Sequence, residues 1–210
     1  MQLRLQLLIG REKAEENKML NWLRKLICPE PEPCPECPKC PELEKDPISV
    51  YFSPDRGADE VIIGFIDRCN ETVDISVYSM THDGIRDAIL RAHERGVTVR
   101  IMTDYLQASN KYADDETFFK AGIPIVRGIR SYQMHNKFVL GDAGNPEVSA
   151  MATGSFNWSK NATEKNNENF VVIRRQETID EFQQEFNSLW DRFQEYWAEQ
   201  PADKQYSLED

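Results

Sequence analysis

Between residues 50 and 127, short apolar runs with the two-residue period of β-strands alternate with segments of helical period. The spacing predicts strands over 50–52, 72–80, 97–103 and 123–127, and helices over 58–69, 83–95 and 113–121. Regular alternation of this kind is typical of layered α/β folds, in which helices flank a largely buried sheet. We therefore expect a mixed, mostly parallel sheet flanked by helices.

The last long segment, 178–197, has the clearest helical pattern in the chain. Its apolar residues form one stripe, and acidic residues cover the opposite face. The stripe consists of Ile179, Phe182, Phe186, Leu189, Trp190, Phe193 and Trp197. A stripe of this width is more often core than a binding surface, so we expect a long C-terminal amphipathic helix packed on the sheet.

Composition divides the chain into four parts. Residues 1–27 have the pattern of an amphipathic helix, and residues 28–47 form a linker rich in cysteine, proline and glutamate. We expect a catalytic domain over 48–198 and a disordered tail over 199–210.

Four cysteines lie within the linker, namely Cys28, Cys34, Cys37 and Cys40. Two overlapping C-x-x-C pairs could bind zinc, because thiolates favour that spacing. A distant second Cys or His pair is missing, however. We therefore prefer a plain linker with reduced thiols, with metal binding, disulfides or lipidation as alternatives.

The chemistry of the chain is concentrated between residues 131 and 170. His135 and Lys137 are separated by one residue and precede the apolar run 138–140. If this run is a strand, the two side chains point the same way, because alternate residues of a strand share a face. An imidazole beside an ammonium group is poor core material, and an anion is its natural companion.

More polar residues follow at two turns. Gly154 and Ser155 begin a strand-to-loop turn that also contains Asn157, and Glu168 precedes the apolar run 170–173. Histidine, lysine, serine, asparagine and glutamate brought together form a plausible phosphate-handling set.

This pattern resembles the HKD motif of the phospholipase D superfamily. The resemblance rests on His135-x-Lys137, on Asp142 five residues after the lysine, and on Gly154-Ser155-x-Asn157. It covers residues 48–197 and is strongest for the small single-motif members, the Nuc-type endonucleases and the Zucchini-like mitochondrial cardiolipin hydrolases. The segment between Asp142 and Gly154 is longer than in the usual motif, and residues 143–146 have the composition of an enlarged hairpin turn.

The resemblance implies hydrolysis of a phosphodiester through a covalent phosphohistidine. His135 would attack phosphorus, and Lys137, Asn157 and Ser155 would hold its oxygens as their charge rises. Glu168 would accept the other imidazole N–H and so orient the ring. For Asp142, named in the motif, we expect a brace for the strand and turn.

One requirement is left open by a single motif. The leaving oxygen needs a proton, which the nucleophilic histidine cannot donate in the same step. A symmetric homodimer in which both copies of His135 face one phosphate would supply it. Paired lysines and asparagines would then replace a divalent cation, so we expect no cofactor and metal-independent activity.

The net charge of the chain is −11, but residues 118–176 carry +4. This segment could attract an anionic substrate, and we expect substrate contacts from Arg127, Arg130 and Lys160. A polar groove favours nucleic acid, single-stranded DNA or RNA above all, and hence an endonuclease. The alternatives are phospholipase D activity on a lipid such as cardiolipin and an inactive phosphate-binding module.

Location follows from the first residues. The apolar patch at the start of the chain is soon interrupted by charge and is a poor signal peptide. We expect a cytoplasmic protein, with peripheral membrane contact through residues 1–27 as the alternative.

Overall fold

The computed structural model describes residues 47–109 and 113–200. The expectations for the helix at 1–27, for the cysteine-rich linker and its metal site, and for the end of the tail lie outside these residues. Within them, no helix is long and apolar enough to cross a membrane.

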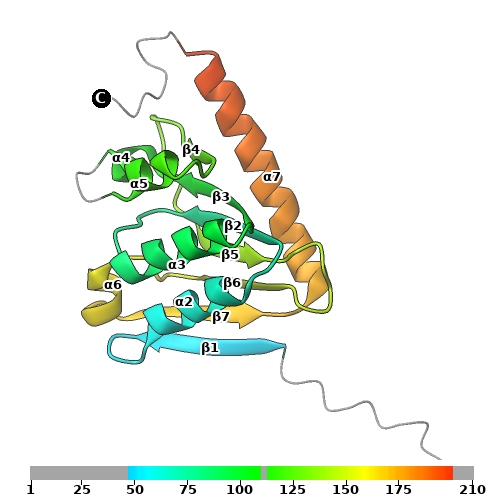
Figure 1. Ribbon diagram of the computed structural model, residues 1–210. Coiled ribbons are helices and arrows are strands. Elements are labelled where there is room, and N and C mark those ends of the chain that lie inside the picture. Colours follow the sequence, from blue (N-terminus) through cyan, green and yellow to red (C-terminus); the bar gives the residue numbers. More distant parts are fainter. Residues whose placement is uncertain (1–46, 110–112, 201–210) are drawn as a thin grey trace, which may run out of the picture. The chain divides into compact units, whose positions relative to one another are not determined.

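A seven-stranded sheet forms the centre of the described part of the chain (Figure 1). Its strands are β1 (Ile48–Ser53), β2 (Thr72–Val77), β3 (Thr98–Thr103), β4 (Ile125–Arg127), β5 (Lys137–Gly141), β6 (Ala150–Gly154) and β7 (Glu168–Ile173). They are arranged in the order β1-β7-β6-β5-β2-β3-β4, which places β5 and β2 near the middle. The expected mixed α/β fold is confirmed.

The pairing of the strands corrects one detail of the expectation. β3 is parallel to β2 and to β4, but the β1–β7, β7–β6, β6–β5 and β5–β2 pairs are all antiparallel. The sheet is therefore mostly antiparallel. The connection from β5 to β6, residues 142–149, is too short for the crossover that parallel neighbours require.

The helices are α2 (Ala58–Arg68), α3 (Asp83–Glu94), α4 (Tyr105–Ala108), α5 (Asp115–Lys120), α6 (Lys160–Glu164) and α7 (Gln176–Ala198). The short helices α4 and α6 were not expected from the sequence. Each begins at a side-chain cap: Asp104 accepts from the backbone N–H groups of Leu106 and Gln107, and Ser159 accepts from that of Ala162. Such one-turn helices are too short to show a periodic pattern.

The two faces of the sheet are covered by different helices. Side chains of α2 and α3 pack on one face, together with Val139, Ala152 and Phe170 from the strands. The apolar stripe of α7 packs on the other face, against Phe138 and Leu140. Neighbouring residues of β5 thus face opposite cores, as the alternation along a strand requires.

Candidate active site

The His135-x-Lys137 motif lies at the ends of two central strands, where β5 begins beside the end of β2. Lys137 is the first residue of β5 and pairs with Val77, the last residue of β2. One step further, the backbone N–H of Tyr78 donates to the carbonyl of Asn136 over 2.8 Å. The loop that carries His135 is therefore attached to the central strands.

His135 and Lys137 are in direct contact. Lys137 Nζ lies 3.2 Å from His135 Nδ1, and it donates to the backbone carbonyl of His135 over 2.9 Å. An ammonium group has no acceptor, so this contact requires an unprotonated Nδ1. The proton of the neutral ring then resides on Nε2, and Lys137 covers the remaining lone pair.

The charge of Lys137 is set by opposing influences. Burial lowers the pKa of Lys137, because removal from water disfavours the ammonium form. The carboxylates of Glu168 and Asp104 act in the opposite direction and raise the pKa. These two acidic residues therefore help to keep a cation beside His135.

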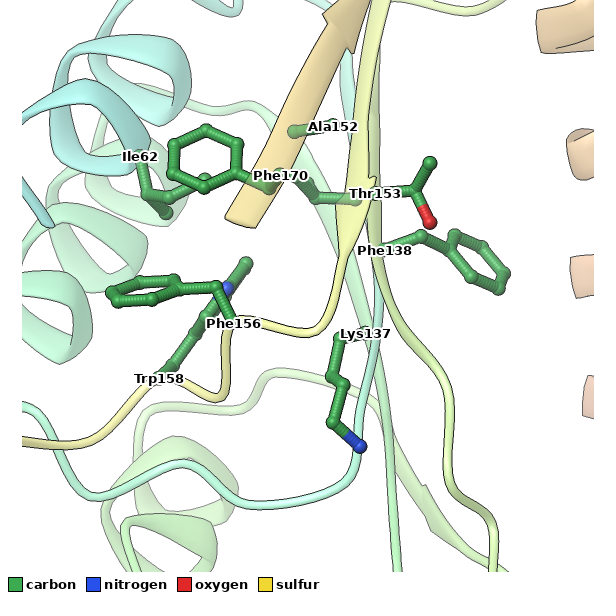
Figure 2. Close-up of a pocket in the computed structure, with 9 residues that line it drawn as sticks. Ile62, Lys137, Phe138, Ala152, Thr153, Phe156, Trp158 and Phe170 are labelled. Carbon is green, nitrogen blue, oxygen red and sulfur yellow. The ribbon is translucent and has the colours of Figure 1, made fainter. Parts of the chain in front are cut away.

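The aliphatic part of Lys137 borders a small apolar pocket. Phe156, Trp158 and Phe170 line this pocket together with Lys137. Figure 2 shows that the amino group of Lys137 points away from these three aromatic residues. The pocket therefore holds the stem of the lysine and leaves its charged end directed toward the site.

Ser155 and Glu168 form a second cluster, where β6 ends and β7 begins. The Ser155 hydroxyl donates to Glu168 Oε2 over 2.5 Å and accepts from the backbone N–H of Asn169 over 3.1 Å. Asn166 Nδ2 donates to Glu168 Oε1 over 3.1 Å. Among the hydrogen bonds of the described residues none joins Glu168 to His135, so the expected contact with the imidazole is absent from this arrangement.

Gly154 permits the close approach of the strands at this cluster. A Cβ atom at this position would lie 2.2 Å from the carbonyl oxygen of Asn169. A side chain would therefore push apart the two segments that carry Ser155 and Glu168. The close packing of these two segments therefore explains the glycine at position 154 of the motif.

Asn157 lies in the loop after β6, between the buried side chains of Phe156 and Trp158. Its side-chain Oδ1 atom is buried and makes no hydrogen bond to any of the described residues. A buried amide oxygen without a partner is uncommon and costs free energy. This oxygen is an acceptor, so any hydrogen bond from Asn157 to a phosphate oxygen has to come from the Nδ2 donor group of the same amide.

Asp142 lies at the opposite end of β5 from Lys137. Its carboxylate accepts hydrogen bonds from the backbone N–H groups of Asn70, Glu71 and Thr72, the shortest being 2.7 Å. The residue is buried and has a φ of 48°. These are the contacts of a brace between the start of β2 and the turn after β5, and they place Asp142 away from the reacting groups.

The three basic residues expected to contact substrate have different surroundings. Arg127 is paired with the buried Asp115 over 3.2 Å. Arg130 is exposed, with its guanidinium 4.9 Å from the centre of the Tyr105 ring. Lys160 is exposed and pairs with Asp83 over 2.9 Å. Arg130 and Lys160 are therefore accessible, whereas Arg127 already serves an internal ion pair.

Two residues outside the motif lie near His135. Buried Asp104 accepts from the backbone N–H of Met134 over 3.0 Å and so holds the loop before His135. The aromatic ring of Tyr78 packs against His135, with ring centroids 4.5 Å apart. Both follow the ends of central strands, a position that often carries functional side chains, but nothing local connects them to the motif.

Comparisons with known proteins agree with this site. Residues 62–190 match the family described as cardiolipin synthase, PLD-like domain. The chain therefore belongs to the phospholipase D-like family, and the assignment made from the HKD motif is confirmed.

Among curated relatives, the chain is 37% identical over 131 residues to a mitochondrial cardiolipin hydrolase of Chlamydomonas reinhardtii, covering 62% of this chain and 56% of that protein. It is 30% identical over 146 residues to a phospholipase D of Rickettsia conorii, covering 68% of each. The chain thus spans little more than half the length of the cardiolipin hydrolase.

Among solved structures, the chain resembles Nuc of Salmonella typhimurium, a phospholipase D family member, with a TM-score of 0.63 and 26% identity. The likeness covers 69% of this chain and 93% of that one. NucT of Helicobacter pylori gives a TM-score of 0.62, also at 26% identity, over 69% of this chain and 95% of the other. The single-motif group expected from the sequence is therefore confirmed.

Proposed function

We propose that this protein is a metal-independent endonuclease that hydrolyses phosphodiester bonds through a covalent intermediate on His135. The observation that carries the proposal is the contact of His135 with Lys137, at the start of β5, where Glu168 supports the positive charge of the lysine. The likeness to Nuc and NucT supports nucleic acid as the substrate.

The first step begins when the substrate phosphate draws the N–H donors of Lys137 away from Nδ1 of His135. This frees an imidazole lone pair, which attacks phosphorus. A P–N bond forms and the P–O bond to the leaving group breaks. Lys137 and the amide of Asn157 stabilise the non-bridging oxygens, whose negative charge rises in the transition state.

The departing oxygen takes a proton from the protonated His135 of a second copy of the chain, which acts as the general acid and becomes neutral. In the second step, water attacks phosphorus and gives up a proton to that same histidine. The P–N bond breaks, and a phosphomonoester and the neutral His135 are released. Because this acid is needed and the chain carries one motif, we propose a homodimer with a shared site.

Glu168 and Ser155 act on this site indirectly. The carboxylate of Glu168 supports the ammonium form of Lys137, and its hydrogen bond keeps the Ser155 hydroxyl in place. Of the basic residues expected to contact substrate, Arg130 and Lys160 are the exposed ones that we assign to the nucleic-acid backbone. Both would contribute mainly through their charge.

A second candidate function is hydrolysis of a membrane phospholipid such as cardiolipin. It is favoured by relatives named mitochondrial cardiolipin hydrolase and phospholipase D. The same residues serve either substrate, since both present a phosphodiester. In this alternative, residues 1–27 would bring the enzyme to the membrane surface.

The test is an incubation of the purified full chain, in EDTA, with labelled single-stranded DNA, single-stranded RNA, duplex DNA and cardiolipin vesicles. We expect cleavage of single strands by the wild type, none by His135→Ala, and normal cleavage by His93→Ala. His93 is a matched control because its ring is bound to the carbonyl of Ala121 on another part of the surface.

Cleavage of cardiolipin alone would favour the lipid alternative. Phosphate binding without turnover by the wild type would indicate an inactive binding module. An active wild type that sediments as a monomer would contradict the shared site.

A further inference from the structure

Tyr78, which follows β2 directly, contacts both members of the HxK motif. Its ring centroid lies 4.5 Å from that of His135, with the rings tilted by 54°. On the same ring, the Lys137 ammonium lies 4.8 Å from the centroid. One aromatic side chain is thus shared by the proposed nucleophile and the proposed phosphate-binding cation.

Three hydrogen bonds, two at the hydroxyl and one at the backbone, hold Tyr78 itself. Its hydroxyl oxygen accepts from Gln107 Nε2 over 3.2 Å and from Gln133 Nε2 over 3.4 Å. Gln107 belongs to α4, whereas Gln133 lies in the loop just before His135. Together with the backbone hydrogen bond from Tyr78 to Asn136, these contacts restrict the orientation of the ring.

An aromatic face suits the task of holding this lysine. Lysine has a flexible four-carbon stem, and fixing it costs considerable side-chain entropy. The face of the ring attracts the ammonium group electrostatically and, unlike a carboxylate, does not neutralise it. The cation therefore stays in place and can still attract an incoming phosphate.

We propose that Tyr78 is a positioning residue, whose ring keeps Lys137 close to His135, so that the lysine can bind the phosphate that the imidazole attacks. The inference rests on the proposed phosphodiesterase function and deepens it. We assign most of the effect on catalysis to the ring and a minor part to the hydroxyl. The two glutamines that bind the hydroxyl are accessible to water, so water can replace the hydroxyl as their partner.

The experiment compares Tyr78→Phe, which keeps the ring, with Tyr78→Leu, which removes it. We expect Tyr78→Leu to lower kcat about 100-fold with KM changed less than about threefold, since small misplacements of reacting groups have effects of this size. Tyr78→Phe should restore kcat to within about threefold of the wild type. The control is Tyr196→Leu, a half-buried tyrosine of α7 that packs on Trp197.

The substrate is bis(p-nitrophenyl) phosphate, a diester without bases or lipid chains. If wild type and His135→Ala hydrolyse it equally, the proposed function fails. If only His135→Ala is inactive and Tyr78→Leu matches the wild type, the function stands and the inference about Tyr78 is wrong. A Tyr78→Phe variant as slow as Tyr78→Leu would likewise overturn the assignment to the ring.

A crystal structure of the Tyr78→Leu protein provides a test that does not depend on turnover. We expect Lys137 Nζ to have left His135 Nδ1, and retention of the 3.2 Å contact would contradict the proposal. If Tyr78→Leu does not fold, Tyr78→Met, with its adaptable side chain, takes its place in both measurements.

Discussion

The hydroxyl of Ser155 donates to Glu168 Oε2 over 2.5 Å and so connects the end of β6 to the start of β7. Glu168 in turn raises the pKa of Lys137 through space, against the effect of burial. Ser155, just after β6, is therefore connected through Glu168 of β7 to the cation of the HxK motif on β5, by one hydrogen bond and one electrostatic interaction.

The pH dependence of activity should report this connection. Lys137 acts as a cation, so activity is lost as pH rises through its pKa. Glu168→Gln removes a charge that raises this pKa, and the alkaline limb of kcat/KM should therefore move to lower pH. We also expect a loss in kcat/KM of roughly tenfold or more at neutral pH. Glu164→Gln, an exposed glutamate on α6, is the control, and an unmoved alkaline limb would refute the coupling.

Asp142→Asn should affect stability far more than catalysis. The carboxylate accepts from three backbone N–H groups, and an amide can no longer accept with both of its atoms. We expect the free energy of unfolding to fall by about 2 kcal/mol. In the folded protein, kcat should stay within about threefold of the wild type. Urea unfolding and kinetics on the same preparation test this, and a large loss of kcat at unchanged stability would place Asp142 in the chemistry.

Asp114 should make the protein less stable as pH rises. Burial raises the pKa of Asp114 to about 6, against the attraction of Arg86. In the unfolded chain the carboxyl of Asp114 ionises near pH 4. Between pH 4 and 6 the folded protein therefore binds more protons than the unfolded chain, and the free energy of unfolding falls as pH rises. Above pH 6 the ionised group has its full destabilising effect, of order 2 kcal/mol.

Asp114→Asn should therefore stabilise the protein at pH 7.5 and have a smaller effect at pH 4.5. Urea unfolding at the two pH values measures the difference. Asp87→Asn is the matched control, because Asp87 also pairs with Arg86 but is exposed. An equal effect of Asp114→Asn at both pH values would show that the carboxyl ionises normally in the folded protein.

The ion pair of Asp74 and Arg100 should be important for anchoring α7. Asp74 is buried in β2 and accepts from Arg100 Nε over 2.7 Å and from Gln183 of α7 over 2.8 Å. The Arg100 guanidinium also lies over the ring of Phe186. Asp74→Ala leaves this arginine without its buried partner and should cost about 3 kcal/mol. Thermal unfolding tests this, with Asp67→Ala, an exposed partner of Arg91, expected to cost less than about 1 kcal/mol.

Local sequence patterns were sufficient to predict most of the strands and the long helices, and to propose which residues carry the chemistry. Periodicity is a local property, so the strands around Val139 and Ile101 and the long helix ending at Ala198 could be predicted. His135 and Lys137 could be proposed as part of a phosphate site because their residue types, their spacing and the later Gly154-Ser155-x-Asn157 form a specific pattern. The family followed from the same residues.

The tertiary structure alone decided how these segments meet. Strand direction depends on contacts between distant residues, so the antiparallel pairing of β5 with β2 was not visible in local spacing. The same pairing brings Tyr78 against His135, although the two residues are far apart in the chain. The ion pair between Arg127 and the buried Asp115 also became apparent only from the folded structure. Side chains acquire these partners only when the sheet assembles, because hydrophobic burial and backbone pairing act across the whole domain.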